Sequence, residues 1–353
     1  MKSFYKIITL SIFSLVIALG VFTSCNKSSK KQLVKDEGQK KVLVYAYDSF
    51  TSDWGPGPAL KEAFEKQSDY ELELISVGDA GEVLSKALLE KKSPRADVLI
   101  GLDNHNAQEA ENHGILAIYE PKGSEGIARA IRFSNFLKSK TEWLITPYDW
   151  GYFALIYDTE SHLPAPNSLE ELSQEIYKKK LILMDPRTST PGLGFVSWTY
   201  AVFGAEGYEA FWKALKPSIL TMAPGWDSGY GLFTAGEAPL VISYSTSPAY
   251  HLEYEDTSRY QALIFDEGHV MQVEGAALVS GAPNPDGGRA FLDFLISKEA
   301  QEIIPLTQWM YPVNEEVVFP ASFAIAPKAE KNLVVASEIA LEASKRLMEI
   351  LAD

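Results

Sequence analysis

The chain has 353 residues, of which 46% are hydrophobic and 22% are charged, so its length allows about two domains with sizeable cores. Its 32 lysines and arginines stand against 47 acidic residues, and the net charge of -15 argues against a nucleic-acid surface, which needs basic side chains. A single cysteine excludes a disulfide framework, a zinc ribbon and an iron–sulfur cluster.

The N-terminal segment has the pattern of an export signal. Two lysines precede an uncharged run over residues 7–22, which is shorter than a transmembrane helix of about 20 residues and suits a secretory core. The run leads to small residues and then Cys25, which resembles a bacterial lipoprotein signal; a chance cysteine near a cleavage site is the alternative. We expect residues 1–24 to be removed, Cys25 to be lipidated, and residues 25–40 to form a polar tether.

The next part of the chain alternates strands and helices. Apolar or alternating runs predict buried strands over residues 41–47, 71–77 and 96–102. Amphipathic helices are expected over residues 58–67 and 81–90. This succession predicts a parallel α/β sheet with right-handed crossovers, and ligands of such sheets lie beyond the carboxyl ends of the strands. Those ends carry polar side chains, namely Tyr47, Asp48, Asp79, Asp103 and Asn104.

A second α/β series follows, and sheet-like segments return after it. We expect strands or apolar sheet segments over residues 153–157, 180–184, 240–244 and 275–280. Helices are expected over residues 194–203, 207–215, 288–296, 300–304 and 335–351. This order predicts two lobes that the chain crosses more than once, with a cleft and hinges between them. The predicted lobes are residues 41–150 with 245–309, and residues 151–244 with 310–353.

Aromatic residues gather at predicted strand ends and loops rather than inside apolar runs, which is typical of side chains that line a site. They are Tyr45, Tyr47, Trp54, Tyr148, Trp150, Tyr152, Trp226, Tyr230, Tyr244, Tyr250, Trp309 and Tyr311. A flat cation over an indole face gains about 2 kcal/mol, and nearby carboxylates add charge complementarity. The candidate carboxylates are Asp48, Asp79, Asp103 and Asp149, for each of which a helix cap is the alternative role.

Two hydroxyl-rich turns follow predicted strands. Ser189 and Thr190 precede a proline at a helix start, where exposed backbone amides bind phosphate or another acceptor. The run from Tyr244 to Pro248 (YSTSP) is the second such turn. A plain capped turn is the alternative for both.

Catalytic patterns are weak in this chain. Its five histidines lack metal-ligand spacing, it has neither a GxSxG elbow nor a GxxxxGK[ST] phosphate loop, and its one cysteine is assigned to the anchor. The residues therefore indicate an exported, two-lobed chain with an aromatic cleft, without catalytic residues, a resident metal or a cofactor.

Seven segments, in this order, resemble the bacterial periplasmic thiamine-binding proteins, which are the substrate-binding components of ABC importers for thiamine and its phosphates. The resemblance covers roughly residues 41–313, and the tail after Pro320 matches poorly. The family member that the chain resembles is a soluble periplasmic protein rather than a lipoprotein. The matching segments are YAYDSFTSDWGPGPALKEAFE (45–65), ADVLIGLDN (96–104), YDWGYFALIYD (148–158), DPRTSTPGLG (185–194), GWDSGYGLF (225–233), LVISYSTSPAYH (240–251) and QWMYPV (308–313).

The resemblance implies the type II periplasmic binding protein fold, with two α/β lobes around a cleft. Aromatic faces would hold the thiazolium and aminopyrimidine rings, and Asp79 would contact the cation or the exocyclic amine. Ser189, Thr190 and helix amides would receive the hydroxyethyl end or its phosphates. Ala80 stands where the family has glycine. The implied ligand contacts are Tyr47, Asp79, Ala80, Ser189, Thr190, Trp226, Tyr244, Ser245, Thr246, Ser247, Pro248, Tyr250 and Trp309.

The signal pattern and the resemblance together lead us to expect a lipid-anchored monomer of the periplasm or cell surface. It would bind thiamine, thiamine monophosphate or thiamine diphosphate and deliver it to a membrane permease. Two alternatives share the fold. Thiaminase I acts on the same ligand through a cysteine nucleophile, and a ferric-ion-binding protein needs clustered tyrosines with histidine or carboxylate, for which Tyr244 and Tyr250 are candidates.

Overall fold

The computed structural model describes residues 40–132, 138–139 and 142–352. The predicted signal peptide, Cys25 and the tether up to residue 39 lie outside these residues. Within the described part, no helix combines the length and the apolar character that crossing a bilayer requires.

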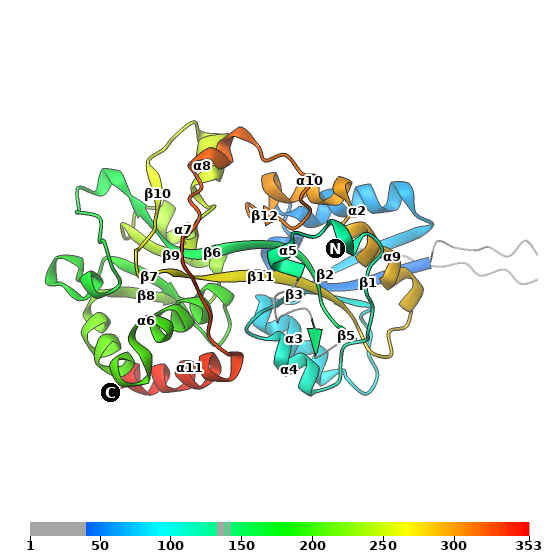
Figure 1. The fold of residues 1–353 in the computed structure, drawn as a ribbon, viewed down its shortest axis with the longest axis horizontal. Coiled ribbons are helices and arrows are strands. Elements are labelled where there is room, and N and C mark those ends of the chain that lie inside the picture. The colour runs from blue at the N-terminus through cyan, green and yellow to red at the C-terminus, as the bar shows by residue number, and fades with distance from the viewer. Residues whose placement is uncertain (1–39, 133–137, 140–141, 353) are drawn as a thin grey trace, which may run out of the picture. The chain divides into compact units, whose positions relative to one another are not determined.

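Three parallel strands begin the sheet, as the sequence predicts. β1 (Lys40–Ala46) lies between β2 (Tyr70–Ser76) and β3 (Val98–Asp103) and pairs in parallel with both. The connections are α2 (Pro56–Gln67) and α3 (Ala80–Leu89), whose apolar faces are buried. In Figure 1, α2 and α10 lie on one side of the sheet and α3 and α4 on the other.

Two long antiparallel strands run through both halves of the described part. β6 (Thr146–Asp158) pairs with β11 (His269–Leu278), and Figure 1 shows the two side by side across the middle of the ribbon. The sheet order is β2-β1-β3-β11-β6-β9-β7-β8. Tyr148 near the start of β6 packs in a first hydrophobic core, whereas Phe153 packs in a second. The prediction that the chain crosses between two halves is confirmed at these strands.

The second half repeats the layering around β9 (Leu240–Tyr244), β7 (Leu181–Met184) and β8 (Ile219–Ala223). The helices predicted over residues 194–203 and 207–215 belong to one element, α6 (Thr190–Leu215). Gly204 interrupts it with a φ of 63°, a left-handed conformation that glycine adopts without steric cost. α11 (Ser337–Ala352) packs against α6 and closes the second core.

The remaining elements are mostly short. The helices are α1 (Asp48–Thr51), α4 (Ala107–Asn112), α5 (Arg129–Arg132), α7 (Trp226–Thr234), α8 (Pro248–Glu255), α9 (Pro285–Leu295) and α10 (Lys298–Thr307). The 3-10 turns are Ser124–Gly126, Thr159–Ser161, Glu170–Ser173, Glu175–Tyr177, Lys216–Ser218 and Ala321–Ile325. The short strands are β4 (Lys138–Ser139), β5 (Glu142–Trp143), β10 (Tyr260–Leu263), β12 (Tyr311–Pro312) and β13 (Asn332–Leu333).

One predicted lobe boundary differs from the packing. The prediction assigns residues 245–309 to the first lobe, yet Tyr260, Phe265 and Val270 pack in the second core. The reason is that β10 pairs with the far end of β6, so the chain returns to the first core only along β11, where Ala276 is buried. The other lobe limits stay predictions.

Candidate functional site

A cavity of about 870 Å³ is lined by residues from both halves of the sheet. Its first side comes from the end of β1, from α2 and from the start of α3. Its second side comes from the starts of α6 and α7, the end of β9 and helix α8. Residues 306–310, at the end of α10 and just beyond it, complete the lining. The volume and the mixed lining are typical of small-molecule sites.

Most of the residues implied by the family resemblance meet at this cavity. Those that line it are Tyr47, Asp79, Ala80, Thr190, Trp226, Tyr244, Ser247, Tyr250 and Trp309. The first and the last of them, Tyr47 and Trp309, are 262 positions apart in the sequence, and only the folded sheet brings them together.

Four implied contacts are not among the lining residues. Ser189 is buried at the N-cap of α6, and Pro248 is the first residue of α8. The backbone amide of Ser245 donates to the carbonyl of Tyr152 at 2.8 Å. The Thr246 hydroxyl is fully buried, 3.8 Å from the Met310 sulfur. These residues support the lining rather than form it.

Aromatic rings form much of the cavity wall. Trp226 and Tyr230 stack with centroids 4.9 Å apart, because four residues along α7 place two side chains on one helix face. Trp54 lies 6.2 Å from Trp226 by ring centroid. Tyr250 meets Trp309 edge to face at 5.3 Å. Trp309 has a φ of 58°, a left-handed backbone that is strained for a bulky residue.

Several aromatic residues singled out from the sequence belong to the protein interior instead. Tyr45 packs in the first core and donates a hydrogen bond to Glu90 at 2.9 Å. Trp150 packs on Tyr311 at 4.8 Å, with the Lys328 ammonium group over both rings. The predicted aromatic residues outside the lining are Tyr45, Tyr148, Trp150, Tyr152 and Tyr311.

The cavity lining is acidic. Among the described residues that form it there is one histidine, His251, and no lysine or arginine. Of the four aspartates proposed from the sequence, Asp79 lines the cavity, while Asp48, Asp103 and Asp149 do not. The carboxylates of the lining are Asp53, Glu62, Asp79, Asp227, Glu255 and Glu274.

Asp79 combines both roles considered for it, as a helix cap and as a site residue. Its carboxylate caps α3 by accepting from the Ala80 amide at 2.6 Å, while Glu82 accepts from the Asp79 amide at 2.9 Å. A β-carbon at Gly225, just before α7, would lie 2.7 Å from an Asp79 carboxylate oxygen. The glycine therefore allows the second half to approach this carboxylate. Burial raises the pKa of Asp79 to about 6, against hydrogen bonds from backbone amides.

Glu274 is a cavity residue that sequence reasoning missed. It lies on β11 and accepts hydrogen bonds from the hydroxyls of Tyr47 at 2.7 Å and Tyr148 at 2.6 Å, and from the Gln272 amide at 2.7 Å. Burial raises the pKa of Glu274 to about 7. A glutamate inside the apolar run VMQVEGAAL was the available signal, because a carboxylate in a buried strand needs a reason to be there.

Three side chains on another side of the cavity are linked by hydrogen bonds. The Tyr230 hydroxyl is 2.9 Å from His251 Nε2, and His251 Nδ1 is 2.7 Å from the Glu255 carboxylate. Burial lowers the pKa of His251 despite that carboxylate. Tyr254, four residues after Tyr250 on α8, also lines the cavity and was not predicted, although the helical spacing would have indicated it.

Comparison with known proteins bears on this geometry. The family model described as bacterial extracellular solute-binding protein matches residues 93–335. The thiamine-binding periplasmic protein of Brucella melitensis is 40% identical over 332 residues, 94% of this chain and 93% of that protein. Its counterpart from Salmonella typhimurium is 41% identical over 293 residues, 83% of this chain and 86% of that protein. The chain belongs to this family of periplasmic solute-binding proteins.

A solved structure agrees with the sequence comparison. A periplasmic thiamin binding protein superposes with a TM-score of 0.82 at 36% identity, covering 89% of this chain and 96% of that one. The type II periplasmic binding protein fold predicted from the sequence is confirmed. The relatives are named as binding proteins, which agrees with the expectation that this family member is not an enzyme.

Asp79→Asn is expected to change how stability depends on pH. The folded-state pKa of Asp79, about 6, lies above its ordinary value of 3.8, so its ionised carboxylate destabilises the empty fold and protonation restores stability. As pH falls from 6 to 4, the free energy of unfolding of the wild-type chain should rise relative to the variant by about 1–3 kcal/mol. Urea titrations at each pH measure this difference.

Asp158→Asn provides a control of opposite sign. Hydrogen bonds from Arg259 lower the pKa of Asp158, so wild type should lose stability relative to this variant below about pH 4. Equal pH profiles for wild type and Asp79→Asn would show that Asp79 has an ordinary pKa in the fold.

Proposed function

We propose that the chain binds thiamine and serves as the substrate-binding component of an ABC importer, outside the cytoplasmic membrane. The observation that carries this proposal is the cavity lining, which combines aromatic faces with six carboxylates and has no lysine or arginine among its described residues. That combination suits a flat cation. The 40% identity to thiamine-binding periplasmic proteins supports thiamine as that cation.

The cation would be held by rings and carboxylates together. Trp226, Trp309 and Tyr250 present aromatic surface, and a desolvated cation over an indole face gains about 2 kcal/mol. Asp79 and Glu274 lie on the first half and on a crossing strand, respectively. We propose that the thiazolium ring is bound between these groups, with the exocyclic amine donating to a carboxylate. Binding would then bridge both halves and favour the closed arrangement.

The phosphates of thiamine monophosphate and diphosphate would be bound by backbone donors. α6 begins at Thr190 and α7 begins at Trp226, and both residues line the cavity. The first amides of a helix have no intrahelical partner and attract anions. The Thr190 and Ser247 hydroxyls would add donors. We include both phosphates in the proposed ligand set on this ground.

The two alternative functions fit the cavity less well. A thiaminase reaction needs a cysteine nucleophile, and the only cysteine of the chain is Cys25, which lies outside the described residues. A ferric site needs converging tyrosine hydroxyls; of the two candidates from the sequence, Tyr244 packs against Phe153 and Tyr250 packs against Trp309. Among the described residues, no group of three or more histidine, cysteine or acidic side chains is arranged to hold a metal ion.

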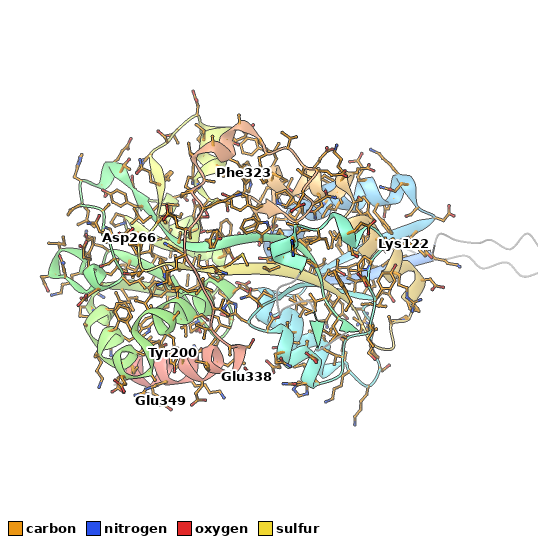
Figure 2. The ribbon with its side chains drawn as sticks, in the orientation of Figure 1. Lys122, Tyr200, Asp266, Phe323, Glu338 and Glu349 are labelled. Carbon is orange, nitrogen blue, oxygen red and sulfur yellow. The ribbon has the colours of Figure 1, made fainter. Side chains whose placement is uncertain are left out.

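Trp226→Ala and Trp309→Ala are each expected to weaken thiamine binding about 10- to 100-fold, because each removes a ring that would cover the cation. Isothermal titration calorimetry measures the dissociation constants. Tyr200→Ala is the control: Tyr200 lies on α6 near α11, outside the cavity lining, and should leave the affinity unchanged (Figure 2). If both tryptophan variants bind thiamine as wild type does, stacking does not hold the ligand.

We further propose that Cys25 is lipidated and anchors the chain to a membrane through the tether. The support is the uncharged run of residues 7–22 followed by small residues and a cysteine. The anchor would keep the folded part close to the permease.

Cys25→Ser is therefore expected to move the chain from the membrane fraction to the soluble fraction, because the acyl chains that hold it are no longer attached. Detergent phase partition of cell extracts measures the distribution. Ser24→Ala keeps the cysteine and a small residue before it, and it should leave the chain in the detergent phase. Equal partition of wild type and Cys25→Ser would contradict lipidation.

A further inference from the structure

We propose that Glu274 carries a proton while the cavity is empty and releases it when a cationic ligand binds. The site would gain the positive charge of the ligand and lose that of the proton, so the net charge of the buried site would stay nearly constant. The O–H bond of the carboxyl group breaks and the proton passes to a buffer base in solution. The inference rests on the proposed function, since the charge of thiamine drives the exchange.

The place of Glu274 in the sheet is the first argument. It lies on β11, where its register partners are Asp103 on β3 and Asp149 on β6, so three acidic residues stand side by side across adjacent strands. Glu274 is only 7% exposed, and its side chain lines the cavity. Because no lysine or arginine is among the described lining residues, an ionised Glu274 has no counter-ion there.

The groups around Glu274 have opposing effects on its pKa. The hydroxyls of Tyr47 and Tyr148 donate to one carboxylate oxygen and the Gln272 amide to the other, which favours the ionised form. Burial is the largest influence on the pKa of Glu274 and raises it, and the negative charges of Asp103 and Asp79 act in the same direction. The result, a pKa of about 7, leaves the carboxyl group poised between its two states.

Burial also shifts the pKa values of the other titratable groups near Glu274. Asp149 is fully buried, and burial raises its pKa well above the ordinary value. Burial also raises the pKa of Tyr244, which keeps its hydroxyl neutral. The pKa of Asp79 is about 6, and that of His251 is lowered by burial. The pKa of Glu274, about 7, is thus closer to neutrality than that of Asp79.

A cation in the cavity would stabilise the ionised carboxylate and lower its pKa, because an opposite charge within about 4–6 Å favours the charged form. At pH 7, a carboxyl group with a pKa of about 7 holds about half a proton, which binding would release. Thiamine affinity should fall about tenfold from pH 8 to pH 6, since only the ionised form accepts the cation. The thiazolium charge itself is permanent over this range.

The test is calorimetric titration with thiamine at pH 7 in phosphate and in Tris, whose ionisation enthalpies differ. The dependence of the observed heat on buffer ionisation enthalpy gives the number of protons exchanged. Wild type should release about half a proton, and Glu274→Gln should release close to none. The Gln272 carbonyl oxygen has no partner among the described residues, so it is free to accept from the new amide and help the variant keep its fold.

Asp158→Asn is the matched control, because it removes a buried carboxyl group that is paired with Arg259 and does not line the cavity. It should keep the proton release of wild type, with thermal unfolding confirming that both variants are folded. Thiamine binding with identical heats in both buffers would overturn the exchange while leaving thiamine binding intact. Release retained by Glu274→Gln would also overturn it, by assigning the proton to another group. No binding by wild type at any pH would overturn the proposed function and this inference together.

Discussion

The site depends on one constraint. Several carboxylates share a partly buried cavity that has no lysine or arginine among its described lining residues. Each carboxylate there costs free energy when it loses water, and neighbouring carboxylates raise that cost further. The elevated pKa values of Asp79 and Glu274 report this cost directly, since burial is the main cause of both. A bound cation lowers this free-energy cost. The empty site is thus destabilised in a way that ligand binding reverses, as is usual for functional sites that trade stability for affinity.

The sheet supplies the frame that keeps these charges in place. β6 and β11 pass through both cores, so residues such as Tyr148 and Glu274 are fixed by strand pairing rather than by loops. The first residues of α3, α6 and α7 also line the cavity, so helix N-termini contribute to the site beside the strands. Rigid elements therefore carry the carboxylates, the rings and the backbone donors, which is what precise recognition of a small molecule requires.

Local patterns in the sequence were sufficient to predict much of the fold. Alternation and apolar runs identified β1, β2 and β3, and the strand-end rule led to Asp79. Helix α7 was missed because Gly229 and Gly231 give its sequence the composition of a loop. Its helicity depends on packing against β7 and β9, which no local pattern reveals.

Long-range pairing also decides which polar and aromatic residues reach the cavity. Trp150 stands between an aspartate and a glycine in the sequence, as Trp226 does, yet pairing of β12 with β6 packs it against Tyr311, outside the cavity lining. Glu274 lies just before the apolar segment predicted over residues 275–280, and only the approach of Tyr47 and Tyr148 shows its role. The family resemblance named nine of the lining residues, whereas the acidic balance of the cavity emerged from the folded structure.

The central claim is that this acidic, aromatic cavity binds thiamine as a cation and leaves it chemically unchanged. A crystal structure of the chain grown with excess thiamine tests it most directly. The account predicts intact thiamine between Trp226 and Trp309, with the thiazolium ring within about 6 Å of the Asp79 or Glu274 carboxylate. An empty cavity, a cleaved molecule, or thiamine bound at another place would contradict it.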